Sequence, residues 1–201
     1  MKLSRNSISK ESISQFNLWL DDRPYDKFKF YFSDHDVEFQ YMVDKFIAQN
    51  EDLCRIIPHN AYLVTRCVKT AAKKMGFCGH FDNYRTTILI PLMIPDTEEN
   101  GDLLVWQNAR PEPKNLFKHI VSKVWFQLFL AKVFFGSIRR HFERIRVDVG
   151  DALTFNGFVN MHCNMYLIGE RRSLLIHFDK PFSNSKFVAM TENLSQFWAR
   201  D

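Results

Sequence analysis

The sequence predicts a mainly β domain, a sandwich or barrel with flanking helices. Three observations favour this fold class. Short apolar runs of strand character recur between residues 61 and 178, with turn-forming residues between them. Helical periodicity is concentrated in the first sixty residues and in one segment near the middle of the chain. With 201 residues the chain is long enough to bury the core of one domain, and no linker divides it.

The N-terminal part, residues 1–60, is expected to provide helical support for the sheet. Helices are expected at Ser12–Leu20 and at Asp34–Asp52. In the second of these, the apolar residues follow the i, i+3, i+4, i+7, i+8 spacing of one buried stripe: Phe39, Met42, Val43, Phe46 and Ile47. Such a stripe is typical of a helix that packs against a sheet.

The β core is expected between residues 61 and 178. The strand-like runs are 62–68, 86–93, 102–106, 144–149, 152–155 and 173–178. The turn-rich segment 95–101 separates the second run from the third, and Gly150 and Asp151 separate the fourth from the fifth. Pro181 stops the last run, and the tail 179–201 is expected to contain a short helix at Thr191–Arg200.

A helical insertion is expected at residues 114–142, between the strand runs. It contains no proline, its middle is apolar nearly all round, and basic residues flank it: Lys114, Lys118, Lys123, Arg139, Arg140 and Arg144. The apolar run is short for a membrane-spanning helix. The favoured interpretation is a helix buried against the sheet or in a dimer interface. The second interpretation is an amphipathic lid or a membrane-surface anchor.

Composition excludes some classes of function. The net charge of +4 is too small for the dense basic surface of a nucleic-acid-binding protein, so no nucleic-acid partner is expected. The cysteines at positions 54, 67, 78 and 163 form no CxxC pair, which argues against a zinc ribbon. The start of the chain lacks the apolar core of a signal peptide. These features predict a cytoplasmic protein, membrane-peripheral if segment 114–142 acts as an anchor.

The most informative motif is the pair His80 and Asp82, just before an apolar run. Residues i and i+2 of an extended backbone point to the same side, so both side chains are expected to face one cavity. His162 follows the run 152–155 by a few residues, as a ligand from a neighbouring strand would. Two imidazoles and one carboxylate can form a facial triad that holds Fe(II) and leaves three coordination positions open for substrate and oxygen.

Other histidines and cysteines are interpreted as structural. The histidines are those at positions 35, 59, 119, 141 and 177, although His177 shares its alternation with Arg171 and could approach the cavity. Cys78 and Cys163 lie beside the proposed ligands and are interpreted as small apolar fillers. Tyr62 is a further candidate to hydrogen-bond a bound molecule from an early strand, although nothing in the sequence fixes the direction of its side chain.

These motifs, in this order, resemble the Fe(II)/2-oxoglutarate-dependent dioxygenases, and more narrowly their prolyl-hydroxylase-like branch. The resemblance covers about residues 61–178. It rests on the HxD pair, the strand that follows it, the run from Gly101 to Val105, the Gly–Asp turn, the distal His162 and a Gly–Glu–Arg segment at 169–171. It implies a double-stranded β-helix, a jelly-roll of the cupin type, with Fe(II), 2-oxoglutarate and O2 as cofactors.

The resemblance also implies a basic residue on the closing strand that binds the far carboxylate of 2-oxoglutarate. Arg171 and Arg172 both fit this position. The Gly–Glu–Arg context and the RxS pattern with Ser173 favour Arg171, whereas the usual spacing from the distal histidine favours Arg172. Strand alternation lets only one of the two face the cavity. We expect Arg171 to be that residue, with Ser173 beside it.

The implied activity is hydroxylation of a small-molecule, lipid-like or peptide substrate, with release of succinate and CO2. Related halogenases have a small residue where this chain has Asp82, so the carboxylate favours hydroxylation, while desaturation and cyclisation stay open. The alternative is a non-catalytic β-helix protein that keeps the fold as a binding or scaffolding module.

Overall fold

The computed structural model describes residues 1–26, 28–33, 36–69, 79–98, 100–126 and 139–182. Its strands are β1 Lys2–Ser4, β2 Phe28–Phe32, β3 Tyr62–Lys69, β4 Thr86–Met93, β5 Leu103–Trp106, β6 Glu143–Ile145, β7 Ala152–Asn156, β8 Met161–Asn164 and β9 Glu170–Phe178. Its helices are α1 Lys10–Asp21, α2 Val37–Ala48, α3 Glu51–Ile56 and α4 Leu116–Val124, with a 3-10 turn, η2, at Arg139–His141. The expected helix at 191–200, the segment 127–138 and Cys78 lie outside the described residues.

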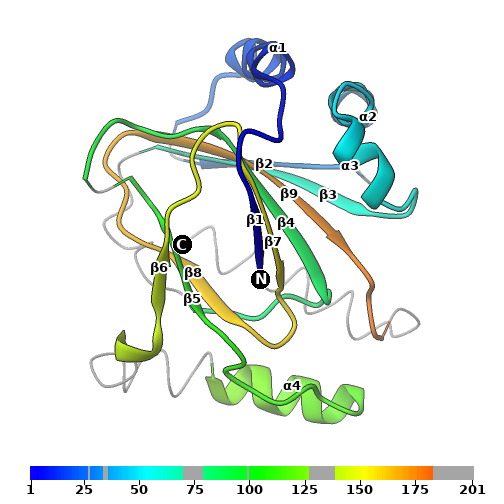
Figure 1. Cartoon of the computed structure of the whole chain (residues 1–201), viewed down its shortest axis with the longest axis vertical. Coiled ribbons are helices and arrows are strands. Elements are labelled where there is room, and N and C mark those ends of the chain that lie inside the picture. The colour runs from blue at the N-terminus through cyan, green and yellow to red at the C-terminus, as the bar shows by residue number, and fades with distance from the viewer. Residues whose placement is uncertain (27, 34–35, 70–78, 99, 127–138, 183–201) are drawn as a thin grey trace.

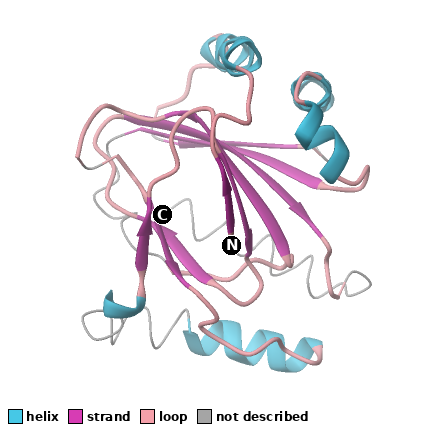
Figure 2. Ribbon diagram, in the orientation of Figure 1, coloured by secondary structure: helices cyan, strands magenta, loops and turns pink. Residues whose placement is uncertain are grey.

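Two antiparallel sheets face each other (Figures 1 and 2). The larger sheet has the strand order β1-β7-β4-β9-β3-β2, and the smaller has the order β6-β5-β8. Figure 1 shows α1, α2 and α3 on the outer side of the larger sheet, and α4 at the opposite end of the molecule. The expected mainly β fold with flanking helices is confirmed.

The larger sheet is buried on both faces, and this determines which side chains reach the interior. On β9, Leu174 and Ile176 join the aromatic core beneath α1 and α2, where Phe16 lies 5.5 Å from Phe46 between ring centroids. The next residue, Leu175, packs on the opposite face, against the core between the two sheets. By strand alternation, the odd-numbered residues of β9 therefore face the smaller sheet.

For the N-terminal part, one expectation is wrong and another is incomplete. The single helix expected at 34–52 is two helices, because the buried Asn50 side chain bonds elsewhere: it donates to Phe46 O (2.6 Å) and accepts from Ser9 N (2.7 Å). The first sixty residues also supply both edge strands of the larger sheet, β1 and β2. The rings of Phe28, Phe30 and Phe32 contact one another along β2, a period-2 signal that a helix-based interpretation overlooked.

One expectation for the β core also needs correction. The strand expected at 144–149 ends at Ile145, because Asp148 and Asp151 form a turn in which each backbone N–H is bonded to the other residue. The strand β8 carries His162 itself, in antiparallel register with β5. Its four residues are too few to give a clear periodic pattern.

The favoured interpretation of segment 114–142 is a helix buried against the sheet or in a dimer interface. Burial against the sheet is wrong for its described first part, and the dimer interface stays a prediction. In α4 only His119 is buried. Asn115 caps the helix by accepting a hydrogen bond from Lys118 N at 2.9 Å. Apolar residues of α4 face outward, as described below.

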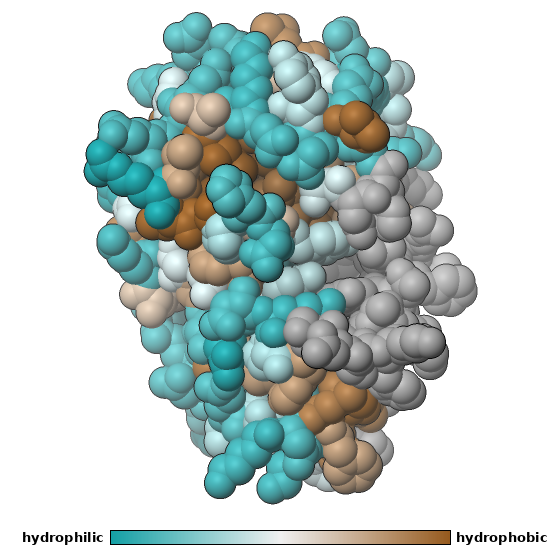
Figure 3. All heavy atoms as spheres, turned by 90° about the vertical axis from the view of Figure 1, so that its right-hand side faces the viewer, coloured by the Kyte–Doolittle hydropathy of each residue, from teal (hydrophilic) through white to brown (hydrophobic). Residues whose placement is uncertain are grey.

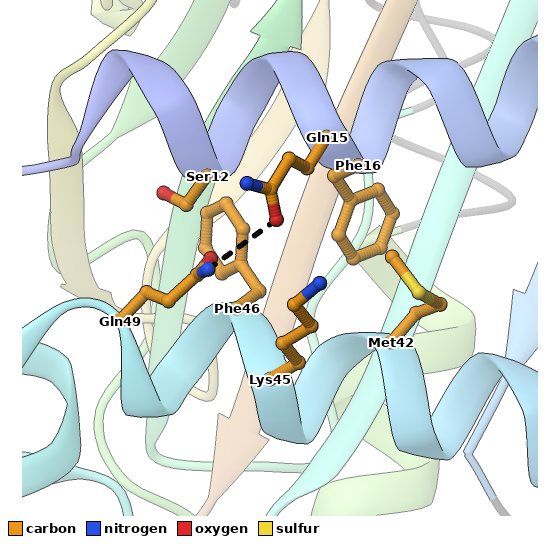
Figure 4. Close-up of a pocket in the computed structure, with 7 residues that line it drawn as sticks. All are labelled: Ser12, Gln15, Phe16, Met42, Lys45, Phe46 and Gln49. Atoms are coloured by element: carbon orange, nitrogen blue, oxygen red, sulfur yellow. Dashed lines mark hydrogen bonds between the residues drawn. The ribbon is translucent and has the colours of Figure 1, made fainter.

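Two hollows lie away from the histidines. One is a small gap between α1 and α2, where Gln49 Nε2 donates to Gln15 Oε1 at 3.3 Å (Figure 4). The other is a cleft of about 800 Å³ lined by residues 94–98, Asn100, Arg144, Arg146, Asp148 and Val149. Neither contains a residue that the sequence singles out for chemistry. In the described part of the chain, no helix is both long enough and apolar enough to cross a membrane.

Candidate metal centre

The segment with His80 and Asp82 is held in extended form by backbone hydrogen bonds to two other segments. His80 and His162 exchange a pair of them, with N···O distances of 2.9 and 3.0 Å. Asp82 N donates to Gly157 O at 2.9 Å. The pairing joins residues 80 and 162, which are far apart in sequence, and it sets their side chains next to each other.

His80, Asp82 and His162 converge as the sequence predicts. One potential ligand atom from each lies within 4.8 Å of those from the other two. Asp82 Oδ1 is 3.9 Å from His80 Nε2 and 3.5 Å from His162 Nε2. The side chain of His162 is 7% exposed, whereas that of His80 is 42% exposed, so the cluster is open on the His80 side.

The orientation of the His162 ring is fixed by contacts on the side away from Asp82. Its Nδ1 lies 3.1 Å from the backbone carbonyl of Asn160, and Phe155 packs edge-on against the ring at a centroid distance of 4.9 Å. A carbonyl can only accept, so Nδ1 carries a proton, and Nε2 is the ring atom that faces Asp82. With Nε2 deprotonated, this is the tautomer that a metal ligand needs.

The second oxygen of Asp82 is held by two residues that sequence reasoning did not assign to the site. Thr87 Oγ1 donates to Asp82 Oδ2 at 2.5 Å, and it lies 3.0 Å from His177 Nδ1. Because the hydroxyl proton goes to Asp82, His177 Nδ1 is the donor to Thr87. The alternation of β9, which puts His177 on the same face as Arg171, had already indicated that His177 could approach the cavity, and the register pairs it with Thr87.

Gly157 provides the space for Asp82. A Cβ at position 157 would clash with the Asp82 side chain, both at Oδ2 and at Cβ. The φ angle at Gly157 is not in the left-handed region, so the lack of a side chain, rather than backbone freedom, is what the site requires.

The charges of the cluster favour an ionised carboxylate. Burial raises the pKa of Asp82, but His162, His177 and His80 together outweigh burial and hold that pKa well below its usual value. Burial lowers the pKa of His162, while the Asp82 carboxylate raises it more. Asp82 is therefore negative at neutral pH and can act as an anionic ligand.

The structure separates the two candidate arginines. Arg172 lies on the outer face, where it bonds Asp21 Oδ1 (2.7 Å) of α1 and Glu170 Oε1 (2.6 Å). Arg171 lies on the inner face and donates to the carbonyls of Asn100 and Gly101; its Nε is 3.4 Å from Ser173 Oγ. Only Arg171 shares the interior with the imidazole cluster.

The guanidinium of Arg171 lies near that of Arg66. Burial lowers the pKa of Arg171 to about 10, Arg66 lowers it in the same direction, and the Asp102 carboxylate opposes both. Arg66 Nη1 donates to Asn164 Oδ1 at 2.8 Å, across the gap between the two sheets. Among the described residues, Arg171 bonds only carbonyls and a hydroxyl, so its charge has no carboxylate in contact. Neither Arg66 nor Asn164 was predicted, because nothing in the sequence relates β3 to β8.

A second polar cluster connects α4 to the HxD segment. Arg110 is 3% exposed; it donates to Phe158 O (2.7 Å) and lies 3.0 Å from His119 Nδ1. Asn83 Oδ1 accepts from Lys123 Nζ at 2.9 Å and lies 3.2 Å from His119 Nε2. Since Asn83 follows Asp82 directly, α4 borders the candidate metal centre.

Comparison with known proteins was made by sequence and by structure. No protein-family model and no curated protein matches the chain. The structure is similar to that of iron-bound HygX from Streptomyces hygroscopicus, with a TM-score of 0.57 at 10% identity over 90% of this chain and 82% of that one. It is also similar to a Pseudomonas putida prolyl-4-hydroxylase, with a TM-score of 0.54 at 10% identity over 89% and 91% of the two chains.

The chain shares the fold of HygX and prolyl-4-hydroxylase. The expected double-stranded β-helix is thereby confirmed. HygX has also been crystallised with nickel and 2-oxoglutarate; that structure has a TM-score of 0.54 and 11% identity to this chain, over 90% and 82% of the two chains. At these identities the likeness concerns the fold, and the chemistry of this chain has to be argued from its own side chains.

Proposed function

We propose that this protein is an Fe(II)- and 2-oxoglutarate-dependent oxygenase that hydroxylates an organic substrate, with release of succinate and CO2. One observation carries the proposal: two imidazoles and one ionised carboxylate converge on the inner face of the fold that also holds the buried guanidinium of Arg171. The likeness to structures crystallised with iron, and with nickel and 2-oxoglutarate, supports it.

The residues fit a divalent metal ion. His80, Asp82 and His162 would be its ligands, in the two-histidine, one-carboxylate set that non-haem Fe(II) oxygenases use. The carbonyl of Asn160 sets the tautomer of His162, and Thr87 holds the outer oxygen of Asp82. Both are the kind of outer contact that orients metal ligands. When bound, iron supplies activation of O2.

The roles of the remaining residues follow from their position. Arg171 would bind the far carboxylate of 2-oxoglutarate by a charge-assisted, bidentate pair, and Ser173 would support the guanidinium from the same strand face. The exposed side of His80 would be the entrance for substrate. The identity of the ligands and of the cosubstrate residues is part of this proposal.

The substrate class stays open among small molecules, lipid-like molecules and peptides. The α4 side of the site carries Lys123, hydrogen-bonded to Asn83. This side of the site is formed by segment 114–142, which is not among the motifs that carry the resemblance. The resemblance therefore does not predict the substrate. A substrate screen therefore follows the cofactor test and does not replace it.

The test is an anaerobic optical titration of the apoprotein with Fe(II) and 2-oxoglutarate. A weak visible charge-transfer band is expected for the unchanged chain and not for His162→Ala. Succinate formation in air is expected to follow the same pattern, and to be abolished in His80→Ala. A folded protein that gives no band with iron supplied would favour the alternative, a binding or scaffolding module that keeps the fold.

A further inference from the structure

We infer that the outward face of α4 is a docking surface for an anionic lipid bilayer. The surface, called here the α4 stripe, consists of Phe117, Val121, Val124 and Trp125, which are 75%, 50%, 45% and 54% exposed. Figure 3 shows hydrophobic residues at the lower end of the molecule, the end at which α4 lies in Figure 1. Binding of a bilayer to this surface does not require a metal ion at the candidate metal centre.

The stripe belongs to one face of the helix. At 100° per residue, the spacing i, i+4, i+7, i+8 of the four residues places them within one sector of the helical wheel. Lys118 lies at the edge of that sector and is exposed. Stripes of this spacing usually face a protein core, whereas this one faces away from it.

The helix cannot simply rotate to bury the stripe, because its opposite side is anchored. His119 is 3% exposed and stacks on Phe158 at 4.7 Å between centroids. Ser122 Oγ accepts from Arg110 Nη1 at 2.6 Å. Just after the helix, Phe126 packs edge-on against Phe81 at 5.3 Å. The amphipathicity of α4 is thus partly inverted: the polar side chains of His119 and Ser122 point inward, whereas the apolar stripe points outward.

Charge indicates which partner would cover the stripe. Residues 113–126 include three lysines and no acidic residue. Lys114 and Lys118 are exposed beside the stripe, and Arg140 of η2 is exposed as well. An apolar helical face with a tryptophan and basic flanks matches the boundary between acyl chains and anionic headgroups. A second copy of the chain would instead bring the same lysines together, which like-charge repulsion opposes.

The place of α4 relates the surface to the metal centre. The inward side of α4 reaches Asn83 through Lys123, and Asn83 follows Asp82. A bilayer on the outward side would lie about one helix diameter, roughly 10 Å, from that contact. This part of the inference rests on the proposed function: it favours lipid-like substrates, or substrates carried by lipid, over freely diffusing ones.

The test is co-sedimentation of the full chain with phosphatidylcholine vesicles, with and without phosphatidylserine. Binding is expected only with phosphatidylserine present, and it should weaken as salt is raised. Phe117→Ser/Val121→Ser should lower the partition coefficient by at least about tenfold. Lys114→Glu/Lys118→Glu should lower it by about tenfold or more on anionic vesicles.

A matched control is available at the other end of the molecule. Leu18 of α1 and Tyr41 of α2 are 62% and 67% exposed, and Leu18→Ser/Tyr41→Ser should leave vesicle binding unchanged. His162→Ala should also bind vesicles normally, which separates this inference from the proposed function.

Three results would overturn the inference. The first is absence of sedimentation with anionic vesicles. The second is an equal loss of binding in Leu18→Ser/Tyr41→Ser. The third is a concentration-dependent dimer that Phe117→Ser/Val121→Ser dissociates while vesicles have no effect, which would assign the stripe to a second copy of the chain.

Discussion

The Thr87 hydroxyl donates a 2.5 Å hydrogen bond to Asp82 Oδ2 and so fixes the carboxylate in one orientation. The other oxygen, Oδ1, is then directed toward His80 and His162. Thr87 is itself held by the Nδ1–H of His177, which lies opposite it in the register of β4 and β9. The candidate ligand is therefore positioned by a relay that begins on the closing strand.

Thr87→Val is expected to weaken metal binding by about tenfold or more, because loss of an outer hydrogen bond to a ligand typically costs this much. Thr87→Ser keeps the hydroxyl and should restore most of the affinity. Calorimetric titration with Co(II) measures both. Equal affinities of Thr87→Val and the unchanged chain would show that the relay does not position Asp82.

Thr65→Val makes the same substitution in β3 of the larger sheet and is the matched control for Thr87→Val. We also expect it to change stability. Thr65 is fully buried on the outer face, and within the described part of the chain its hydroxyl has no hydrogen-bond partner. Removing a buried unsatisfied hydroxyl should raise the free energy of unfolding by about 1 kcal/mol. Urea unfolding measures the change, and metal affinity should stay as it was. A lower stability would mean that the hydroxyl is satisfied.

Gly157→Ala is expected to abolish metal binding while the protein stays folded, because the new methyl group would occupy the space of the Asp82 carboxylate. The control is Gly79→Ala, where the new methyl would meet Met161 Cε at 2.7 Å. That atom ends a flexible side chain, so it can move at small cost. The comparison uses metal titration with circular dichroism as a check of folding. Normal metal binding by Gly157→Ala would remove Asp82 from the ligand set.

Arg171→Gln and Arg172→Gln are expected to affect different properties, the first 2-oxoglutarate binding and the second stability. The first should weaken 2-oxoglutarate binding by about tenfold or more and leave metal affinity unchanged, because it removes the cation that the interior offers to a carboxylate. The second should leave 2-oxoglutarate binding unchanged and lower the free energy of unfolding by about 1–3 kcal/mol, since Asp21 and Glu170 each lose a charged hydrogen bond from Arg172. Calorimetry on the Mn(II)-loaded protein and urea unfolding measure the two effects. The reverse pattern would assign the cosubstrate to Arg172.

His119 is expected to make stability fall with acidity. Burial, with Arg110 and Lys123 nearby, lowers its pKa to about 3 in the folded protein, compared with an ordinary value near 6.5. Between these values the unfolded chain binds a proton that the folded chain does not. The contribution of His119 to the free energy of unfolding is thus fully present above pH 6.5. As the pH falls below that value, the free energy of unfolding decreases by up to about 1.4 kcal/mol per pH unit.

The measurement for His119 is the free energy of unfolding in urea from pH 7 to pH 5. Other groups also titrate in this range, so the slope of the free energy of unfolding against pH is compared between the unchanged chain and His119→Gln. Glutamine can hydrogen-bond but has no ring that titrates. A shallower slope in the variant is expected. Identical slopes would show that His119 is not held neutral by the fold.

Periodicity and motif spacing in the sequence determined a large part of this protein. The apolar runs bounded by turn residues predicted β3, β4 and β7 closely, because strands of a sheet that is buried on both faces have nearly continuous apolar sequences. The HxD spacing placed His80 and Asp82 on one side of an extended segment. These features depend on local backbone geometry, which a single sequence contains.

Only the tertiary structure decided which face of each element is the inner one. Alternation showed that Arg171 and Arg172 must point to opposite sides, but packing of α1 on the outer face of β9 determined that Arg171 is inside. The same pairing brought Thr87 and His177 to Asp82, and anchoring of His119 turned the apolar side of α4 outward. Such contacts join residues distant in the chain, so no local pattern encodes them.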